Sequence, residues 1–350
     1  MQVIAYDRTY LGTGGGTLTY GGKGGVGLTV TYSDIGNLSK AQVINSKVSN
    51  FNTVDVQGLS AARIIAGGAT AGLIVSEDTG SLSGAVVINL LRNETTAGIF
   101  GSTVSAGERV DVLARDVSGM DEVALLNQLI DAKDGGQQRE EKVFDYDASA
   151  LYSDGNYTVQ EGDTLAQIAE KFDLTEAKLR EANGLSEDDT IKVGDNLIIP
   201  VDNHHKNNVG IIAVAGIAQA SGNNVGLSFG WNDIANTFAA VIEESTVKTL
   251  NARGNVGVRA ISSAAITGFS LGVGGAKQFA GAGSATVNNI ANQITAKVNK
   301  STVTADNIAI DADDRSWIGS LAGQVTISIG KVSVGASVAV NNLGNQAEAE

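Results

Sequence analysis

The sequence is short of the residues that usually build large cores and reactive sites. Its 350 residues include no Cys, one Pro and two Trp, and aromatic residues make up only 5%. The absence of Cys excludes a disulfide framework and a thiolate site, and it is compatible with the cytoplasm and with bacterial export alike. Because large side chains are few while Gly occurs 44 times, the core must consist of small and β-branched residues, which favours stacked, repetitive strands.

Positive charge is also scarce, with 24 Lys plus Arg against 38 Asp plus Glu and a net charge of −14. A surface of that sign repels phosphate backbones, so nucleic acid is excluded as an expected partner. No stretch approaches the roughly 18 apolar residues of a membrane-spanning helix, so we expect no such span. The first residues show no charged region followed by an apolar run, so no signal peptide is visible. Because the chain begins and ends in mid-pattern, we interpret it as a piece of a longer protein, and any export signal stays undetermined.

A repeat is visible when the chain is aligned with itself. Each of four blocks holds an Asn that is followed nine positions later by a Ser. The blocks are "SDIGNLSKAQVINSKV" (33–48), "NLLRNETTAGIFGSTV" (89–104), "NDIANTFAAVIEESTV" (232–247) and "NNIANQITAKVNKSTV" (288–303), and the marker pairs are Asn37 with Ser46, Asn93 with Ser102, Asn236 with Ser245 and Asn292 with Ser301. A fifth block begins near Asn345, so the marker Asn residues are spaced by 56, 143, 56 and 53 positions.

Alternating segments follow each marker Ser and predict strands. The pairs Val54 and Val56, Val110 and Val112, Val256 and Val258, and Ile308 and Ile310 should share one face. The period predicts a mainly β fold in the form of a β-solenoid, with turns of roughly 18 to 20 residues and about three turns in each repeat. The marker Asn residues should then occupy equivalent corners and form hydrogen bonds within the turn. A β-sandwich of several sheets is the alternative.

The stretches "GASVAVNN", "GSATVNNIAN" and "STVTADNIAIDA" resemble the passenger regions of large Gram-negative surface proteins, namely autotransporter and two-partner-secreted adhesins and leukotoxin-like repeat proteins. The resemblance implies a parallel right-handed β-helix. It also implies a secreted, extracellular location, displayed on the outer membrane of a bacterial cell, with a host-cell or bacterial surface as a further partner.

One spacing is too long by 87 residues, the difference between 143 and 56. The extra chain lies roughly between residues 119 and 206, and because the repeat resumes in phase, its two ends should emerge close together. We therefore divide the chain into β-helix repeats at 1–118, a helix and linker at 119–156, a small module at 157–202, and further repeats at 203–350. The helix of the linker should begin at Asp121 and bury Val123, Leu126 and Ile130.

The module reads as strand, helix, helix, strand. Thr164 and Gln167 have the spacing of a capping box at the start of the first helix. The apolar stripe of that helix is Leu165, Ile168, Ala169 and Phe172, and the expected inward residues of the second are Leu174, Ala177 and Leu179.

Three stretches of the module, "YTVQEGDTLAQIAEKF", "LREANGL" and "IKVGDNLIIP", resemble the LysM domain over its entire length. The resemblance implies a βααβ fold that binds N-acetylglucosamine-containing glycan, such as peptidoglycan or a chitin-like glycan, in a shallow groove between two loops. The implied glycan-binding residues are Gly162, Asp163, Thr164 and Leu165 in the first loop and Asn183, Gly184, Leu185 and Ile191 in the second. Asp163 and Thr164 could instead cap the helix, and Leu165 could instead fill the core.

The sequence offers little for catalysis, so we expect no enzyme, no catalytic residues, no cofactor and no metal site. The one acidic group is Asp311, Asp313 and Asp314, which should face solvent, and the two His residues, His204 and His205, are neighbours that point apart in an extended linker. Two alternatives stay open: a stalk whose LysM module binds nothing, and a cell-wall or polysaccharide-acting enzyme anchored by the module.

Overall fold

The computed structural model describes residues 1–74, 80–116, 155–159, 162–171, 176–183, 185–186, 189–199, 210–251, 254–329 and 332–350. The chain forms two compact units. The first unit contains Met1–Gly119 and Asn208–Glu350, and the second contains Met120–Asn207.

The described part of the first unit is built of strands that pair in parallel. They are β1 (Gln2–Gly21), β2 (Gly25–Ile35), β3 (Leu38–Ile44), β4 (Lys47–Ile74), β5 (Gly80–Leu91), β6 (Glu94–Phe100), β7 (Thr103–Asp116), β10 (Ile211–Ile234), β11 (Thr237–Glu243), β12 (Thr246–Thr249), β13 (Asn255–Ser262), β14 (Ala265–Ile290), β15 (Gln293–Asn299), β16 (Thr302–Thr304), β17 (Asn307–Asp314), β18 (Trp317–Ser328), β19 (Val332–Leu343) and β20 (Gln346–Ala349). The prediction of a mainly β fold with parallel strands is thereby confirmed, and the right-handed winding of a β-helix stays a prediction.

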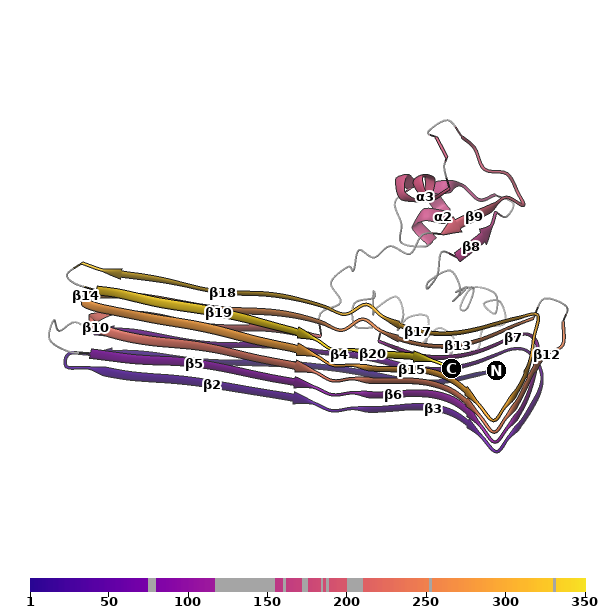
Figure 1. Ribbon diagram of the computed structural model, residues 1–350, viewed down its shortest axis with the longest axis horizontal. Coiled ribbons are helices and arrows are strands. Elements are labelled where there is room, and N and C mark those ends of the chain that lie inside the picture. Colours follow the sequence, from indigo (N-terminus) through magenta and orange to yellow (C-terminus); the bar gives the residue numbers. More distant parts are fainter. Residues whose placement is uncertain are drawn as a thin grey trace, which may run out of the picture. The chain divides into compact units, whose positions relative to one another are not determined.

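Each strand lies beside the strand one repeat further along the chain (Figure 1). Asp55 lies beside Asp111, and Ile234 lies beside Ile290. The chain therefore returns to an equivalent position after one repeat, and we call each such return a circuit and the set of neighbouring circuits the stack. The prediction of about three short turns in each repeat is wrong. The Gly/Ala/Ser-rich runs continue as strand, and β4 alone is 28 residues long, so a whole repeat is used in a single long circuit.

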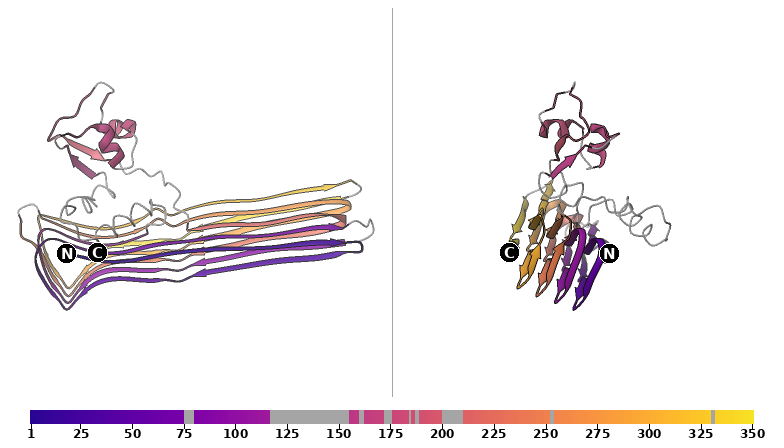
Figure 2. Two further views of the ribbon diagram at one scale, coloured as in Figure 1. Left: turned by 180° about the vertical axis from the view of Figure 1, so that it is seen from behind. Right: turned by 90° about the vertical axis from the view of Figure 1, so that its right-hand side faces the viewer.

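Each circuit has two parts, which lie end to end along the long axis in Figures 1 and 2. The part at the right of Figure 1, the corner arm, contains the five-stranded sheet in the order β20-β15-β11-β6-β3 together with β7, β12, β13, β16 and β17. The other part, the flat arm, contains β2, β5, β10, β14, β18 and β19, with β1 from Leu11 and β4 from Ile64. Its strands form two layers that run out to a tip and back.

The corner arm has an apolar interior of small and β-branched side chains. The predicted shared face is confirmed for Val54, Val56, Val110, Val112, Val256 and Val258, which are all buried. In the last circuit, by contrast, Ile308 is 48% exposed. Each circuit turns a corner at the residue before the marker Ser, and these residues are Asn45, Gly101, Glu244 and Lys300, with φ of 48°, 55°, 49° and 46°.

The marker Asn residues stand at equivalent positions, as predicted, but their hydrogen bonds join neighbouring circuits and do not close a turn. The backbone N–H of Asn93 donates to Asn236 Oδ1 at 2.9 Å, and Asn236 donates likewise to Asn292 Oδ1 at 2.9 Å. The side-chain amide then crosses the interior, as from Asn292 Nδ2 to Ser262 Oγ at 2.9 Å. The marker Ser residues form a second ladder, in which Ser102 N–H donates to Ser245 Oγ at 3.0 Å.

The insertion takes the place of a two-residue link between the two arms. In the next circuit only Ser263 and Ala264 separate β13 from β14. In the circuit that carries the insertion, β7 ends at Asp116, and Gly210 stands opposite Ala265, to whose carbonyl it donates at 3.0 Å. Residues 117–209 therefore occupy the place of the link, a slightly longer segment than the 87 residues that the spacing predicted.

Two residues of the difference correspond to the link that the insertion replaces, and the rest arises at the tip of the flat arm. There the connection in the inserted circuit, from Ala220 to Asn223, is shorter than the equivalent one from Leu73 to Gly80.

The two ends of the insertion leave the stack close together, as predicted. Asp116 lies beside Ser60 of β4, and Ile211 lies beside Ile64 of the same strand. Ser60 and Ile64 are about 13 Å apart along β4.

Candidate functional site

The second unit has the element order that the sequence predicts. Its described elements are β8 (Gly155–Thr158), α2 (Leu165–Lys171), α3 (Glu176–Ala182) and β9 (Asn196–Ile199), and β8 pairs antiparallel with β9. The helix predicted for the linker before them lies outside the described residues.

One small apolar core holds these elements together. Its buried members are Val159, Leu165, Ile168, Ala169, Leu179 and Leu197. The stripe predicted for the first helix is confirmed at its three described positions, whereas Phe172 and Leu174 lie outside the described residues. The prediction for Ala177 is wrong, because this residue is exposed. Two positions apart on a helix are about 200° apart in direction, so Leu179 and Ala177 cannot both point inward.

The first predicted loop is shaped by a glycine and a capping box. Gly162 has φ of +93°, and a Cβ there would meet nothing within 4 Å, so the backbone conformation and not crowding requires glycine. Thr164 N–H donates to Gln167 Oε1 at 3.1 Å, and Gln167 N–H donates to Thr164 Oγ1 at 3.3 Å. This confirms the predicted capping box. Leu165 is 5% exposed, so its side chain supports the loop from the core, and Asp163 is half-buried.

The second predicted loop begins at the end of α3. Asn183 Nδ2 donates to the Leu179 carbonyl at 2.8 Å, and Leu185 N–H donates to the Arg180 carbonyl at 2.9 Å, so both close the helix end. Leu185 and Ile191 pack against the same core as Leu165. The structure thus anchors both loops in one core. Gly184 lies outside the described residues, and the glycan contact of all eight residues stays a prediction.

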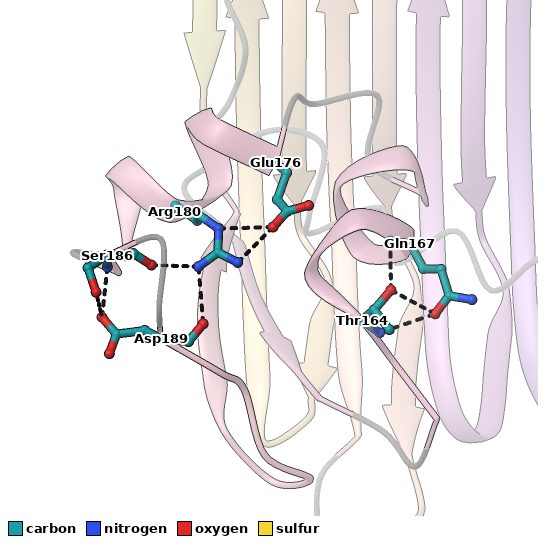
Figure 3. Close-up of polar contacts among 6 residues, drawn as sticks. All are labelled: Thr164, Gln167, Glu176, Arg180, Ser186 and Asp189. Atoms are coloured by element: carbon teal, nitrogen blue, oxygen red, sulfur yellow. Dashed lines mark hydrogen bonds and ion pairs between the residues drawn. The ribbon is translucent and has the colours of Figure 1, made fainter.

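An arginine that the sequence did not single out holds the second loop (Figure 3). Arg180 donates through Nη1 to the carbonyls of Ser186 at 2.6 Å and Asp189 at 3.1 Å. Its Nε and Nη2 donate to Glu176 Oε1 at 2.9 Å and 2.7 Å. The only sequence signal was the four-residue spacing of Glu176 and Arg180 on one helix face. The guanidinium ties the loop to α3 and fixes the direction of two loop carbonyls.

The same loop contains a carboxylate with a lowered pKa. Asp189 Oδ2 accepts hydrogen bonds from Ser186 Oγ and Ser186 N–H, both at 2.7 Å. These bonds, with a smaller contribution from the charge of Arg180, lower the pKa of Asp189 below its usual range. The tie between Asp189 and Ser186 is therefore complete above the ordinary pKa of Asp, about 3.9, and is lost as the pH falls through the lower pKa of the folded state.

Replacing Ser186 with Ala is expected to move the pKa of Asp189 back toward its ordinary value. The Ser186 hydroxyl is the largest cause of the shift, and its loss leaves the backbone N–H and Arg180 in place. An NMR titration of the carboxyl carbon measures this pKa directly. Thr190→Ala, at an exposed residue of the same loop, is the control and should leave the titration unchanged. An identical titration in Ser186→Ala and the unaltered protein would contradict the assignment.

The first unit shows a different arrangement of its acidic group from the predicted one. Asp311 is solvent-facing and 50% exposed, and Asp313 pairs with Arg315 at 2.6 Å. Asp314 does not simply face solvent, because it accepts hydrogen bonds from Ser316 and from the marker residue Asn345. The amide of the marker Asn reaches across the interior to this carboxylate, which sequence alternation could not show.

No metal-binding group of three or more His, Cys, Asp or Glu side chains is found among the described residues, and His204 and His205 lie outside them. No helix in the described ranges is long and apolar enough to cross a membrane.

Comparison with known proteins bears on the second unit. No curated protein and no solved structure matches the chain. Residues 157–200 match the family model of the LysM domain, which is the segment that contains the capping box, the two loops and the Arg180 contacts. The chain therefore carries a LysM domain at residues 157–200.

Proposed function

We propose that the LysM domain binds N-acetylglucosamine-containing glycan, such as peptidoglycan or chitin, at the two loops that begin at Gly162 and Asn183. The match of residues 157–200 to the LysM family carries this proposal. The local structure supports it, since Gly162, Thr164, Asn183 and Leu185 all lie on loops anchored in one core.

The chemistry of the ligand fits loops of this kind. An acetamido group needs a hydrogen-bond donor, an acceptor and an apolar surface for its methyl group. Gly162 lets backbone groups approach closely, and Leu185 and Ile191 are partly buried apolar side chains beside the second loop. A single domain with so few contacts should bind weakly, with Kd roughly between micromolar and millimolar.

We further propose that the first unit is a solenoid stalk of a secreted or surface-displayed bacterial protein. LysM domains typically occur in extracellular or cell-surface proteins. The parallel stack supports the stalk, because each circuit contacts chiefly its neighbours and the marker ladders run through successive circuits. Display on the outer membrane, in the manner of an adhesin passenger, belongs to the same proposal.

The insertion point supplies a sharp test of glycan binding. Residues 117–209 are replaced with Ser-Ala, the link that the next circuit uses between β13 and β14. We expect retention on purified peptidoglycan and on chitin beads to fall at least tenfold, while far-UV circular dichroism keeps its strand signal. Equal retention with and without the insertion would place glycan binding elsewhere.

Point variants then separate a binding domain from a domain that merely decorates the stalk. Gly162→Val strains a positive-φ position and Asn183→Ala removes a cap, so both should weaken retention, whereas Ala177→Ser at an exposed position of α3 should not. Absence of retention in the unaltered protein would favour the decorated stalk.

We propose that the chain binds glycan without cleaving it. Paired carboxylates in a cleft or an activated nucleophile would be needed for cleavage, whereas Asp313 and Asp314 are engaged with Arg315, Ser316 and Asn345. Incubation of the protein with peptidoglycan should release no soluble sugar. Release of fragments would favour the anchored enzyme.

A further inference from the structure

The two arms of the first unit have opposite polarity. In the corner arm the interior is apolar, and outward positions such as Lys40 and Glu94 form an ion pair at 3.2 Å on the surface. In the flat arm the outside is apolar, and the interior toward the tip consists of small and polar side chains. At the junction with the corner arm the interior instead holds an apolar cluster that includes Ile64, Ile211 and Ile266. Strand β4 passes through both, with Val54 and Val56 buried inside the corner arm and Thr70 buried inside the flat arm while Leu73 is exposed. Strands in water normally bury their apolar face.

Many polar side chains in the interior of the flat arm form hydrogen bonds with one another or with the backbone. Thr17 and Thr29 hydroxyls lie 2.9 Å apart across the two layers, and Thr70 Oγ1 donates to the Gly84 carbonyl at 2.7 Å. Asn232 Nδ2 donates to Asn288 Oδ1 at 2.8 Å as part of a buried amide ladder. Hydrogen bonds between neighbouring circuits and between the two layers therefore stabilise the polar part of this interior.

The outside of the flat arm is apolar on both layers. The outward residues that are at least about 40% exposed are, on the layer of β2, Val26, Leu28, Val30, Tyr32, Leu82, Val225, Leu227, Trp231, Val332, Val334, Val338 and Val340, and on the other layer Leu18, Tyr20, Leu73, Val214, Phe269, Leu271, Leu321, Val325 and Ile327. They form rows across the stack, as Tyr32, Ile88, Trp231, Val287 and Val340 lie side by side. A continuous apolar surface of this size marks a contact site.

Among the described residues of the flat arm, charged side chains stand only at its two ends. The segments 11–22, 25–33, 64–74, 80–91, 211–232, 265–276, 278–290, 317–329 and 332–343 contain no Asp, Glu, Lys or Arg. Lys23 and Lys277 follow at the tip, and Asp34, Arg92 and Asp233 stand at the junction with the corner arm. Tyr10 and Trp317, both exposed, also lie near this junction. Apolar rows bounded by aromatic and then charged residues are the pattern of lipid-facing strands.

We propose that the flat arm is a lipid-contacting surface, which takes up the acyl-chain region of a membrane while the corner arm stays in water. The length fits, since strand from Ile211 to Ala220 spans about 33 Å at 3.3 Å per residue, close to the roughly 30 Å of a hydrocarbon layer. A second copy joined by a two-fold axis would cover one layer and leave the other apolar. Lipid covers both layers, and this favours lipid over self-association.

The fluorescence of the two Trp residues of the chain can detect lipid at this surface without an added label. Trp231 is 42% exposed on one layer, and Trp317 is 36% exposed near the junction. The full 350-residue protein is mixed with uncharged phosphatidylcholine vesicles and floated on a density gradient. We expect the protein to float with the vesicles, its fluorescence to shift to the blue, and lipid with bromine on the acyl chain to quench it.

The double variant Leu227→Lys with Leu271→Lys places one cation on each layer, at positions that are 59% and 50% exposed. We expect its vesicle partition coefficient to fall at least tenfold with unchanged circular dichroism. Ile44→Lys, at a 51% exposed position of the corner arm, is the matched control and should bind as the unaltered protein does. The proposal is overturned if the unaltered protein stays in the aqueous fraction, or if the double variant partitions equally. It is also overturned if the protein without lipid forms oligomers that shield both Trp residues, and if the double substitution dissociates these oligomers. A second copy of the chain is then the partner.

Discussion

Replacing Asn236 with Ala is expected to lower the free energy of unfolding of the first unit by about 2 to 3 kcal/mol. Asn236 is 2% exposed, and its Oδ1 accepts the backbone N–H of Asn93, which is itself 4% exposed. Ala removes the acceptor and leaves this N–H buried without its partner, a change that costs about 1 to 3 kcal/mol on its own. The lost side-chain volume at a buried site adds a cavity term.

Urea denaturation followed by circular dichroism measures this effect. Asn251→Ala is the matched control, because Asn251 is exposed, and surface substitutions usually stay within about 0.5 kcal/mol. Equal unfolding midpoints in the two variants would contradict a stabilising role for the ladder. A chain of stacked circuits can lose two-state behaviour, so the midpoint and the slope are compared together.

The ladder also predicts that neighbouring substitutions do not add. Asn93 and Asn236 are neighbours in the ladder of marker Asn residues. Asn93 Oδ1 accepts a hydrogen bond from Asn37 N–H, and Asn93 N–H donates to Asn236 Oδ1. The double variant Asn93→Ala with Asn236→Ala should therefore differ from the sum of the single variants by more than about 0.5 kcal/mol, whereas either one combined with the distant Asn251→Ala should be additive.

The sequence revealed the equivalence of the marker residues but not the path of the chain between them. A period of 56 residues is the same whether a repeat makes three short turns or one long circuit. The length of a circuit depends on where strands end, and the Gly/Ala/Ser-rich runs carry no Pro to end them. The partner of each marker Asn is 53, 56 or 143 residues away, so no local signal could identify it.

The alternation of apolar and polar residues in the sequence also did not show which face of the flat-arm strands is buried. In "VGLTVTYS" (26–33) the apolar residues Val26, Leu28, Val30 and Tyr32 alternate with Gly27, Thr29, Thr31 and Ser33. A period of two defines two faces but does not say which one is buried. The usual assumption would place Leu28 inside, whereas the structure buries Thr29 and exposes Leu28.

The LysM domain was more predictable because its signals are local. The capping box of Thr164 and Gln167 lies within four residues, and its two reciprocal hydrogen bonds follow from that spacing. Arg180 was missed because its partners in the loop are the backbone carbonyls of Ser186 and Asp189, and every residue type supplies a carbonyl. The sequence alone therefore identified the loop but not what holds it.

Replacing Leu179 with Ala is expected to unfold the LysM domain and leave the first unit folded. Leu179 is 0% exposed and belongs to a small core with six buried members among the described residues. Such a substitution costs about 2 to 5 kcal/mol. A domain of this size has a total stability of only a few kcal/mol, at about 0.05 to 0.15 kcal/mol per residue, so the loss removes most or all of it.

The two units should respond separately, because the chain forms two compact units and the insertion leaves and rejoins the stack within about 13 Å of one strand. In Leu179→Ala, limited proteolysis should cut within the insertion, glycan retention should disappear, and the urea midpoint of the first unit should be unchanged. Val193→Ala is the matched control, since Val193 is 66% exposed in the same domain, and it should keep both retention and resistance to proteolysis. If Leu179→Ala instead lowered the midpoint of the first unit as well, the stack would depend on the folded insertion. The two-residue link of the next circuit argues against this dependence, because that circuit completes the same strands with Ser263 and Ala264 alone.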